Sequence, residues 1–331
     1  MPDQPTPRHN PRPPQARSDF EAILRAYEKS GGNPEFLKST QIASLVISGN
    51  TVLGLNRLPG ISAEAESLPD GVHIRLQIAP GARFENPIHL CFGVVPAEGV
   101  QRILADFDIG AGAEVEFMAH CTFPNALQVQ HTMEGTIHVG PGATMRYQET
   151  HYHGESGGVE VLPKAQVTVD EGGKYFTGFN LTQGRLGRME FDYTVDVGAH
   201  GLAELTAKAL GYGDDEIVIR ETIRLNGEYA RGLAKSRIAV RDHARSDVYG
   251  TTEGNAPFAR GHVDCIEIVR GHAVANAVPV VRVADDRAMV THEAAIGAVG
   301  KKELETLMAR GLDGETAVDV IVRGMYREGR A

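Results

Sequence analysis

Two hydrophobic patterns divide the chain. Between residues 41 and 298, short runs alternate apolar and polar residues, as at positions 114–117 and 144–147. Such alternation is typical of β-strands that bury one face. Towards both ends, apolar residues instead recur every three or four positions, which indicates amphipathic helices. The sequence therefore predicts a mainly β core with a short helical segment on either side.

The N-terminal helical pattern covers residues 19–30. Its apolar face consists of Phe20, Ile23, Leu24 and Tyr27. Asp19 is expected to cap this helix and Gly31 to end it, and a second short helix is expected at residues 34–39. These elements form an N-terminal helical segment, residues 19–40. Residues 1–18 carry six prolines within their first fourteen positions, which predicts a disordered tail.

A helical hairpin is predicted in the C-terminal segment, residues 299–331. Its apolar stripes consist of Leu304, Leu307 and Met308 in the first helix and Ala317, Val318, Ile321, Val322 and Met325 in the second. Gly311 is expected to end the first helix and Asp313 to cap the second. Two roles for the hairpin remain open. It either caps the end of the β core or offers a docking surface to another protein.

Similar glycine turns recur through the β core. They are centred on Gly81, Gly112, Gly142, Gly172 and Gly198, with steps of 31, 30, 30 and 26 residues. A near-constant period of this size indicates stacked units that share one continuous core. The units lack the helices of leucine-rich, ankyrin and tetratricopeptide repeats. The prediction is therefore a β-helix of stacked strand repeats over residues 41–298.

Charge and composition exclude several classes of protein. The net charge of −10 comes without a basic stripe, which argues against nucleic acid as a partner. No apolar run has the length of a membrane span, and the N-terminus has no signal-peptide pattern. The three cysteines, Cys91, Cys121 and Cys265, form no CxxC motif, which favours reduced thiols in a cytoplasmic protein.

Cys265 and the pair His292–Glu293 are the first candidate site. If they lie close together, their thiolate, imidazole and carboxylate can bind a metal such as iron. Three ligands leave a coordination position open, which suits transfer of a cluster better than its permanent storage. The competing interpretation is a buried structural cysteine and a surface pair at the end of a strand.

His151 and His153, with Glu155 close behind, are a second candidate. In a strand these two imidazoles share one face, as in the metal sites of cupins. The competing interpretation is a solvated strand end. His120–Cys121 is a further thiol–imidazole pair, for which a buried cysteine next to a turn is the alternative. No glycine motif completes a dinucleotide site or a P-loop, so the chain is expected to lack an ATP site of its own.

Several segments together resemble the SufB/SufD family, the scaffold proteins of the Suf iron–sulfur cluster assembly system. They are residues 108–124 (DIGAGAEVEFMAHCTFP), 131–147, 236–265, 279–297 (ending THEAAIG) and 307–324. The resemblance implies a β-helix core that scaffolds a nascent cluster and C-terminal helices that dock the SufC ABC-type ATPase. It also implies that Cys265 accepts sulfur or holds the cluster, with His292 and Glu293 in the matching HEA motif.

The resemblance further implies partners and a role. They are a SufC-type ATPase, a cysteine desulfurase or other sulfur donor, and acceptor apoproteins. The chain is expected to act as an assembly scaffold and not as an enzyme, holding an iron–sulfur cluster transiently, and no sequence feature supports a flavin. It is expected to form a homodimer, or a heterodimer with a paralogous scaffold. Two alternatives remain: a structural partner of the ATPase without its own cluster, and a cupin-like metal enzyme that uses His151 and His153.

Overall fold

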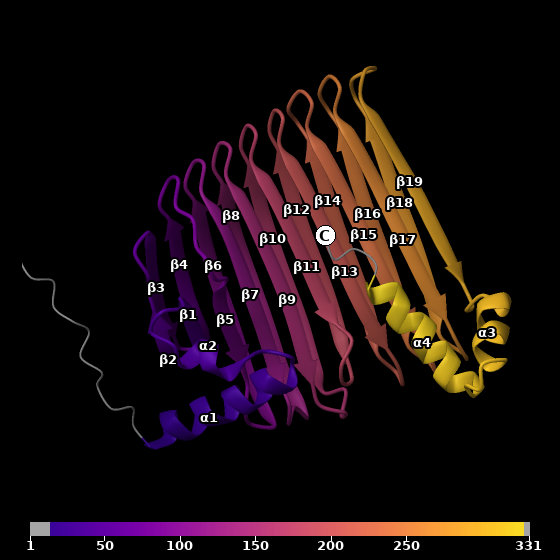
Figure 1. Ribbon diagram of the computed structural model, residues 1–331, viewed down its shortest axis with the longest axis horizontal. Helices are drawn as coiled ribbons and strands as arrows, with labels where there is room; N and C mark the ends of the chain where they lie inside the picture. Colours follow the sequence, from indigo (N-terminus) through magenta and orange to yellow (C-terminus); the bar gives the residue numbers. More distant parts are fainter. Residues whose placement is uncertain (1–13, 328–331) are drawn as a thin grey trace, which may run out of the picture.

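The computed structural model describes residues 14–327 and shows a two-sheet β-solenoid with helices near both ends (Figure 1). The first sheet contains, in spatial order, β19 (Met289–Gly297), β17 (Arg260–Val269), β15 (Arg231–Val240), β13 (Leu202–Gly211), β11 (Lys174–Leu181), β9 (Thr144–His153), β7 (Glu114–Phe123), β5 (Ile88–Gly93), β1 (Ser44–Ser48) and β2 (Thr51–Asn56). The second contains β18 (Val274–Val283), β16 (Arg245–Gly254), β14 (Glu216–Leu225), β12 (Arg188–Val197), β10 (Val159–Val169), β8 (Gln128–Val139), β6 (Glu98–Ile109), β4 (Gly71–Ile78) and β3 (Ile61–Leu68).

From β4 onwards, successive strands alternate between the two sheets, so each coil of the solenoid contributes one strand to each. Neighbours within a sheet are parallel, except for the antiparallel pairs β1–β2 and β3–β4. Alternate side chains point inward and form one continuous apolar core, which includes Phe117, Phe191 and Ile219. The expected β-helix of stacked repeats is therefore confirmed.

The turns at one end of the coils form a ladder of left-handed residues. Gly81, Gly112, Gly142 and Gly172 have φ between 65° and 70°. The next members are His200, Tyr229 and Phe258, with φ of 55°, 60° and 59°. The prediction of Gly198 as the fifth turn centre is therefore wrong by two residues. The rings of these three residues stack, with centroids 5.3 Å and 4.9 Å apart, and this stacking compensates for a conformation that glycine otherwise favours.

Helices α1 (Pro14–Lys29) and α2 (Pro34–Lys38) lie against the first strands (Figure 1). α1 begins at Pro14, so Asp19 lies inside the helix and is not its N-cap. Proline suits the first turn of a helix because its missing N–H has no partner there in any case. Part of the predicted tail is thus helical, and the remainder, residues 1–13, lies outside the described residues. Gly31, with φ of 94°, ends α1 as predicted.

Helices α3 (Lys301–Met308) and α4 (Gly314–Arg327) form the predicted hairpin. Asp313 caps α4, because its Oδ1 accepts hydrogen bonds from the N–H groups of Glu315 and Thr316. α4 packs on the outside of the first sheet, where the Tyr326 hydroxyl donates to the Ala209 carbonyl at 2.8 Å. β18 and β19 remain largely exposed, so the interpretation of the hairpin as a cap is wrong. No described helix has the length and hydrophobicity needed to cross a membrane.

Candidate metal and cluster sites

Cys265 lies on β17 with its side chain directed into the core, and only 2% of the residue is exposed. It pairs in register with Ser236 on β15 and with Ala294 on β19. Burial raises the pKa of its thiol, although the neighbouring Ser236 acts in the opposite direction. The predicted strand position is confirmed, and the thiol sits one strand away from the edge of the first sheet.

His292 and Glu293 lie within β19 and not at the end of a strand, as the competing interpretation assumed. His292 pairs in register with Val263, whose side chain is buried in the core, and Glu293 pairs with Asp264. Adjacent strand residues point to opposite faces. His292 therefore shares the inner face with Cys265, whereas Glu293 lies on the outer face. One chain does not bring all three side chains together.

The last coil of the solenoid exposes many apolar side chains. At least 38% of each of these residues is exposed: Val274, Val278, Val280, Val281, Val283, Met289 and Ile296. They belong to β18 and β19, each of which is an edge strand of its sheet. Edge strands with free backbone groups and an exposed apolar surface are typical of sites that pair with another chain.

Cys121, Glu149 and His151 form the single group of three metal-ligating side chains whose ligand atoms lie within 4.8 Å of one another among residues 14–327. All three are buried and face the core from neighbouring strands of the first sheet. In the β7–β9 register, Cys121 is directly opposite His151, and Glu149 lies two residues before His151 on β9. The parallel stacking of two coils thus brings a thiol, a carboxyl and an imidazole together.

A chain of hydrogen bonds connects this group. Glu149 Oε1 lies 2.6 Å from His151 Nε2 and accepts from the Cys121 thiol at 3.6 Å. On the other side of its ring, His151 Nδ1 lies 3.3 Å from His153 Nε2. His153 Nδ1 lies 3.1 Å from the carbonyl oxygen of Arg185. The chain therefore runs from the thiol through three side chains to the backbone of the next coil.

The hydrogen bonds fix the positions of the protons. The Arg185 carbonyl can only accept, so His153 Nδ1 carries a hydrogen. Burial lowers the pKa of His153 to about 3, so its ring is neutral and its Nε2 is an acceptor. His151 Nδ1 must then donate to His153. Its Nε2 and the Glu149 carboxyl consequently share one proton between them.

The electrostatic environment follows from burial. Desolvation alone would raise the pKa of Glu149, but the hydrogen bond and the charge of His151 outweigh it and hold the pKa below the usual value. Burial, followed by the nearby Glu149, raises the pKa of Cys121 well above that of a free thiol. His131 on β8, in the opposite sheet, is also fully buried, and its pKa falls to about 3.

These contacts correct two sequence expectations. His151 and His153 are each 1% exposed, so the solvated strand end is wrong. They do share one face, as the H-x-H spacing indicates. Glu155 is not their carboxylate, because it lies beyond β9 and accepts a hydrogen bond from Tyr212 at 2.6 Å. The carboxylate is Glu149, which the sequence analysis did not consider.

His120 and Cys121 point to opposite faces of β7. Cys121 belongs to the core between the sheets, whereas His120 Nδ1 lies 2.6 Å from Ser30 Oγ under the N-terminal helices. The pair is therefore not a joint thiol–imidazole site. The alternative, a buried cysteine, is confirmed, although Cys121 lies within a strand and not beside a turn.

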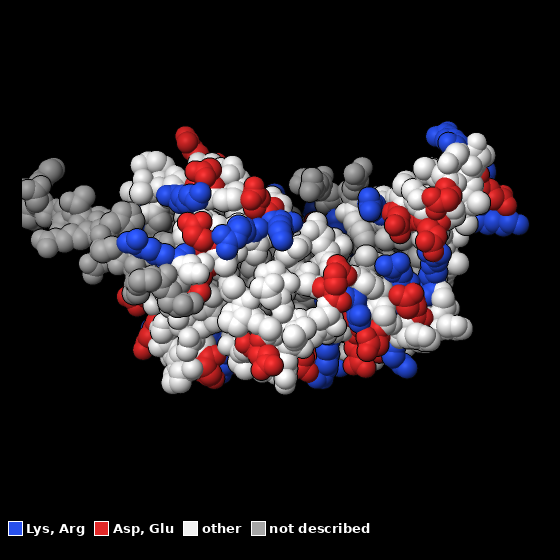
Figure 2. All heavy atoms as spheres, turned by 90° about the horizontal axis from the view of Figure 1, so that it is seen from below, with Lys and Arg blue, Asp and Glu red and all other residues white. Residues whose placement is uncertain are grey.

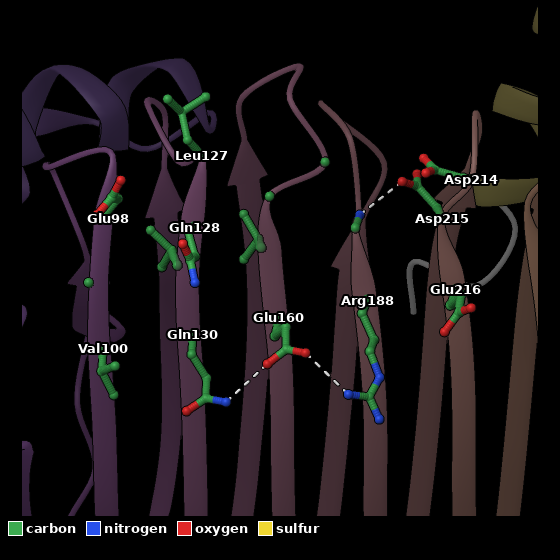
Figure 3. A pocket seen from close by; sticks show the side chains of 16 residues that line it. Glu98, Val100, Leu127, Gln128, Gln130, Glu160, Arg188, Asp214, Asp215 and Glu216 are labelled. Atoms are coloured by element: carbon green, nitrogen blue, oxygen red, sulfur yellow. Dashed lines mark hydrogen bonds and ion pairs between the residues drawn. The ribbon is translucent and has the colours of Figure 1, made fainter.

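The outer face of the second sheet has a groove of about 740 Å³ that crosses β6, β8, β10, β12 and β14 (Figure 3). Within it, Glu160 accepts hydrogen bonds from Gln130 at 3.0 Å and from Arg188 at 3.1 Å. These polar groups satisfy one another, so the groove offers no evident reactive group. On the face seen in Figure 2, basic and acidic side chains are interspersed.

Comparison with known proteins agrees with the architecture. A family model described as the SufBD core domain of the SUF system for FeS cluster assembly matches residues 102–325. An iron–sulfur cluster assembly SufBD family protein of Methanocaldococcus jannaschii is 34% identical over 93% of this chain and 98% of its own length. One of Pyrococcus horikoshii is 35% identical over 94% of both chains. The chain therefore belongs to the SufBD family of iron–sulfur cluster assembly proteins.

Proposed function

We propose that two copies of this chain pair through their last coils and assemble a nascent iron–sulfur cluster between them. The observation that carries the proposal is the exposed apolar edge formed by β18 and β19, which lies beside Cys265 and His292. Pairing of two copies buries this surface and brings two thiols and two imidazoles towards one interface. A compact cluster needs about four ligands, which one chain does not supply.

Glu293 has a separate place in this arrangement. It lies on the outer face of β19, away from Cys265 of its own chain. We assign it to the proposed ligand set as a carboxylate that acts across the interface. Mixed ligands of this kind hold a cluster less firmly than four cysteines, which suits a cluster that is handed on to an acceptor protein.

A SufC-type ATPase is the proposed partner of α3 and α4. The stripe residues Leu304, Leu307 and Ile321 are only partly buried, and Met308 is 46% exposed. Val318 and Val322 instead line a cavity of about 480 Å³ between α4 and the strands. Three residues separate the end of β19 from the start of α3. Movement of the docked ATPase would therefore act directly on the strand that covers Cys265, and ATP-driven changes would expose or close the site.

A structural partner of the ATPase without its own cluster is the second candidate. It is favoured by the 2% exposure of Cys265, which is typical of a structural cysteine. The cupin-like enzyme has less support, because its two histidines are each 1% exposed and a substrate has no direct access to them.

Anaerobic reconstitution with iron and sulfide tests the scaffold. We expect wild type to develop cluster absorption and a cluster Mössbauer spectrum, and Cys265→Ala to lose both, because the thiolate is its strongest cluster ligand. Cys91→Ala is the matched control, since Cys91 is equally buried but lies under α1. A cluster that persists in Cys265→Ala contradicts the proposed site. No cluster in either protein, with the ATPase still bound, would support the structural partner.

The docking surface is tested by Met308→Glu. A charge in an apolar contact must be desolvated, so we expect ATPase binding to weaken at least about tenfold, or about 1.4 kcal/mol. Isothermal titration calorimetry with the SufC-type ATPase measures the effect. Ala309→Glu, at the exposed next position, adds the same charge on another side of the helix and is expected to bind normally. Equal binding by both variants would place the docking surface elsewhere.

A further inference from the structure

We propose that Cys121, Glu149 and His151 form a resident site for one divalent transition metal, zinc(II) or iron(II), inside the solenoid. Three strands of the first sheet, β11, β13 and β15, separate β9 of this site from β17, which carries Cys265. It is independent of the proposed cluster interface. Thiolate, carboxylate and imidazole together are a ligand set that zinc and iron accept.

The geometry requires little rearrangement. Zinc binds these donors at about 2.0–2.3 Å, so neighbouring ligand atoms around a tetrahedral ion lie about 3.4 Å apart. The three donors already lie within 4.8 Å of one another, and Cys121 Sγ is 3.6 Å from Glu149 Oε1. The 2.6 Å separation between Glu149 Oε1 and His151 Nε2 must open by under about 1 Å, because a shared proton now holds the two atoms together.

Charge balance favours a dication. A divalent ion bound by one thiolate, one carboxylate and one neutral imidazole forms a group without net charge. Burial makes any uncompensated charge costly, and all three residues are at most 3% exposed.

The surroundings complete the site. His153 accepts the hydrogen bond of His151 Nδ1–H and is itself anchored on the Arg185 carbonyl. A hydrogen-bond acceptor at Nδ1 orients a ligating imidazole with its Nε2 towards the metal. Across the core, His131 Nδ1 is buried without a hydrogen-bond partner, and its ring centroid lies 6.0 Å from that of His151. His131 is therefore the candidate for the fourth ligand.

Cobalt(II) is the probe for this site. The full chain is produced in minimal medium with added cobalt, and bound metal is measured by mass spectrometry beside the absorption spectrum. We expect one cobalt per chain, a near-ultraviolet thiolate-to-cobalt band and the intense visible bands of four-coordination. Cys121→Ser is expected to lose the thiolate band, and Glu149→Gln to bind cobalt at least tenfold more weakly. A thiolate band that persists in Cys121→Ser would overturn the proposal.

Two matched controls and one wild-type measurement separate the outcomes. Cys91→Ser and Cys265→Ser remove the other thiols and are expected to keep the cobalt spectrum. Cys265→Ser would then lose the cluster but retain the metal, which distinguishes this site from the proposed function. X-ray absorption of the zinc-loaded wild type avoids any folding defect of a variant. One sulfur at about 2.3 Å is expected, whereas a shell without sulfur, or folded protein without bound metal, contradicts the site.

His153→Gln tests the positioning role. We expect a loss of cobalt affinity of about 10–100-fold while the thiolate band survives at saturation, because Cys121 still ligates. A purely structural role for His153 would change stability and leave the cobalt affinity of the folded protein unchanged.

Discussion

Replacing Asp215 with alanine is expected to lower the free energy of unfolding by about 3–5 kcal/mol. Asp215 is only 1% exposed, and its carboxylate accepts four hydrogen bonds. They come from Arg185 Nε at 2.9 Å and from the backbone N–H groups of Leu186, Gly187 and Tyr212 at 3.1, 3.0 and 3.0 Å. The substitution leaves Nε of the largely buried Arg185 side chain and three backbone N–H groups without their acceptor.

Asp214 provides a matched control on the neighbouring residue. It also pairs with Arg185, at 2.5 Å, but its side chain is 93% exposed. Water replaces such a contact easily, so Asp214→Ala is expected to change stability little. Urea unfolding followed by circular dichroism compares the two variants. Equal losses in both would show that the charge of Arg185, and not the buried acceptor, determines the effect.

The repeat period was sufficient to predict most of the fold. Steps of about 30 residues place each turn above the previous one, and the alternation of apolar residues assigns the inner face. The error at Gly198 arose because the ladder passes from glycine to His200, where ring stacking replaces glycine's conformational freedom. Sequence rules for turns describe single turns and do not include contacts between stacked ones.

The same repeat period of about 30 residues also identifies the residues of the buried site, because it shows which residues lie side by side in neighbouring coils. Adding one step of 30 to Cys121 leads to His151, which is its register partner. Glu149 and His153 then share the inner face because they are two residues away on either side. The assumption that polar side chains at the end of a strand are solvated places His151 and His153 at the surface and therefore does not lead to this site. Polar groups in a core are usually exceptions that a function or a partner explains.

The placement of the C-terminal candidate residues is predictable from the sequence only in part. Neighbouring strands carry Cys265 and His292 on one face, as proximity requires. The Glu293 side chain points to the opposite face, because Glu293 is adjacent to His292 in a strand. The exposure of the last coil depends on where the stack ends and where α4 packs, and these are long-range contacts that local patterns do not encode. The proposed dimer follows from that exposure.

Acid is expected to destabilise the protein between pH 7 and pH 5, because several histidines are buried in neutral form. Burial lowers the pKa of His131 and His153 to about 3 and that of His120 to about 4, whereas an unfolded histidine titrates near 6.5. Below pH 6.5 the unfolded chain therefore binds more protons than the folded chain. The stabilisation is fully present above pH 6.5 and is lost as the pH falls towards the folded values.

At pH 5, the neutral burial of each of these three histidines is expected to lower the free energy of unfolding by about 2 kcal/mol. Their sum of about 6 kcal/mol is partly offset by Glu221, because burial raises the pKa of its carboxyl to about 8 and the group therefore favours the folded state more as the pH falls. Urea midpoints at pH 7, 6 and 5 measure how stability depends on pH, and His120→Gln is expected to reduce the slope of this dependence by about one proton.

His138 is the control, because hydrogen bonds with Asp108 and Asp170 raise its pKa. It favours the folded state at low pH, so His138→Gln should increase the sensitivity to acid. An unchanged slope in His120→Gln would mean that its neutral burial does not drive the acid transition.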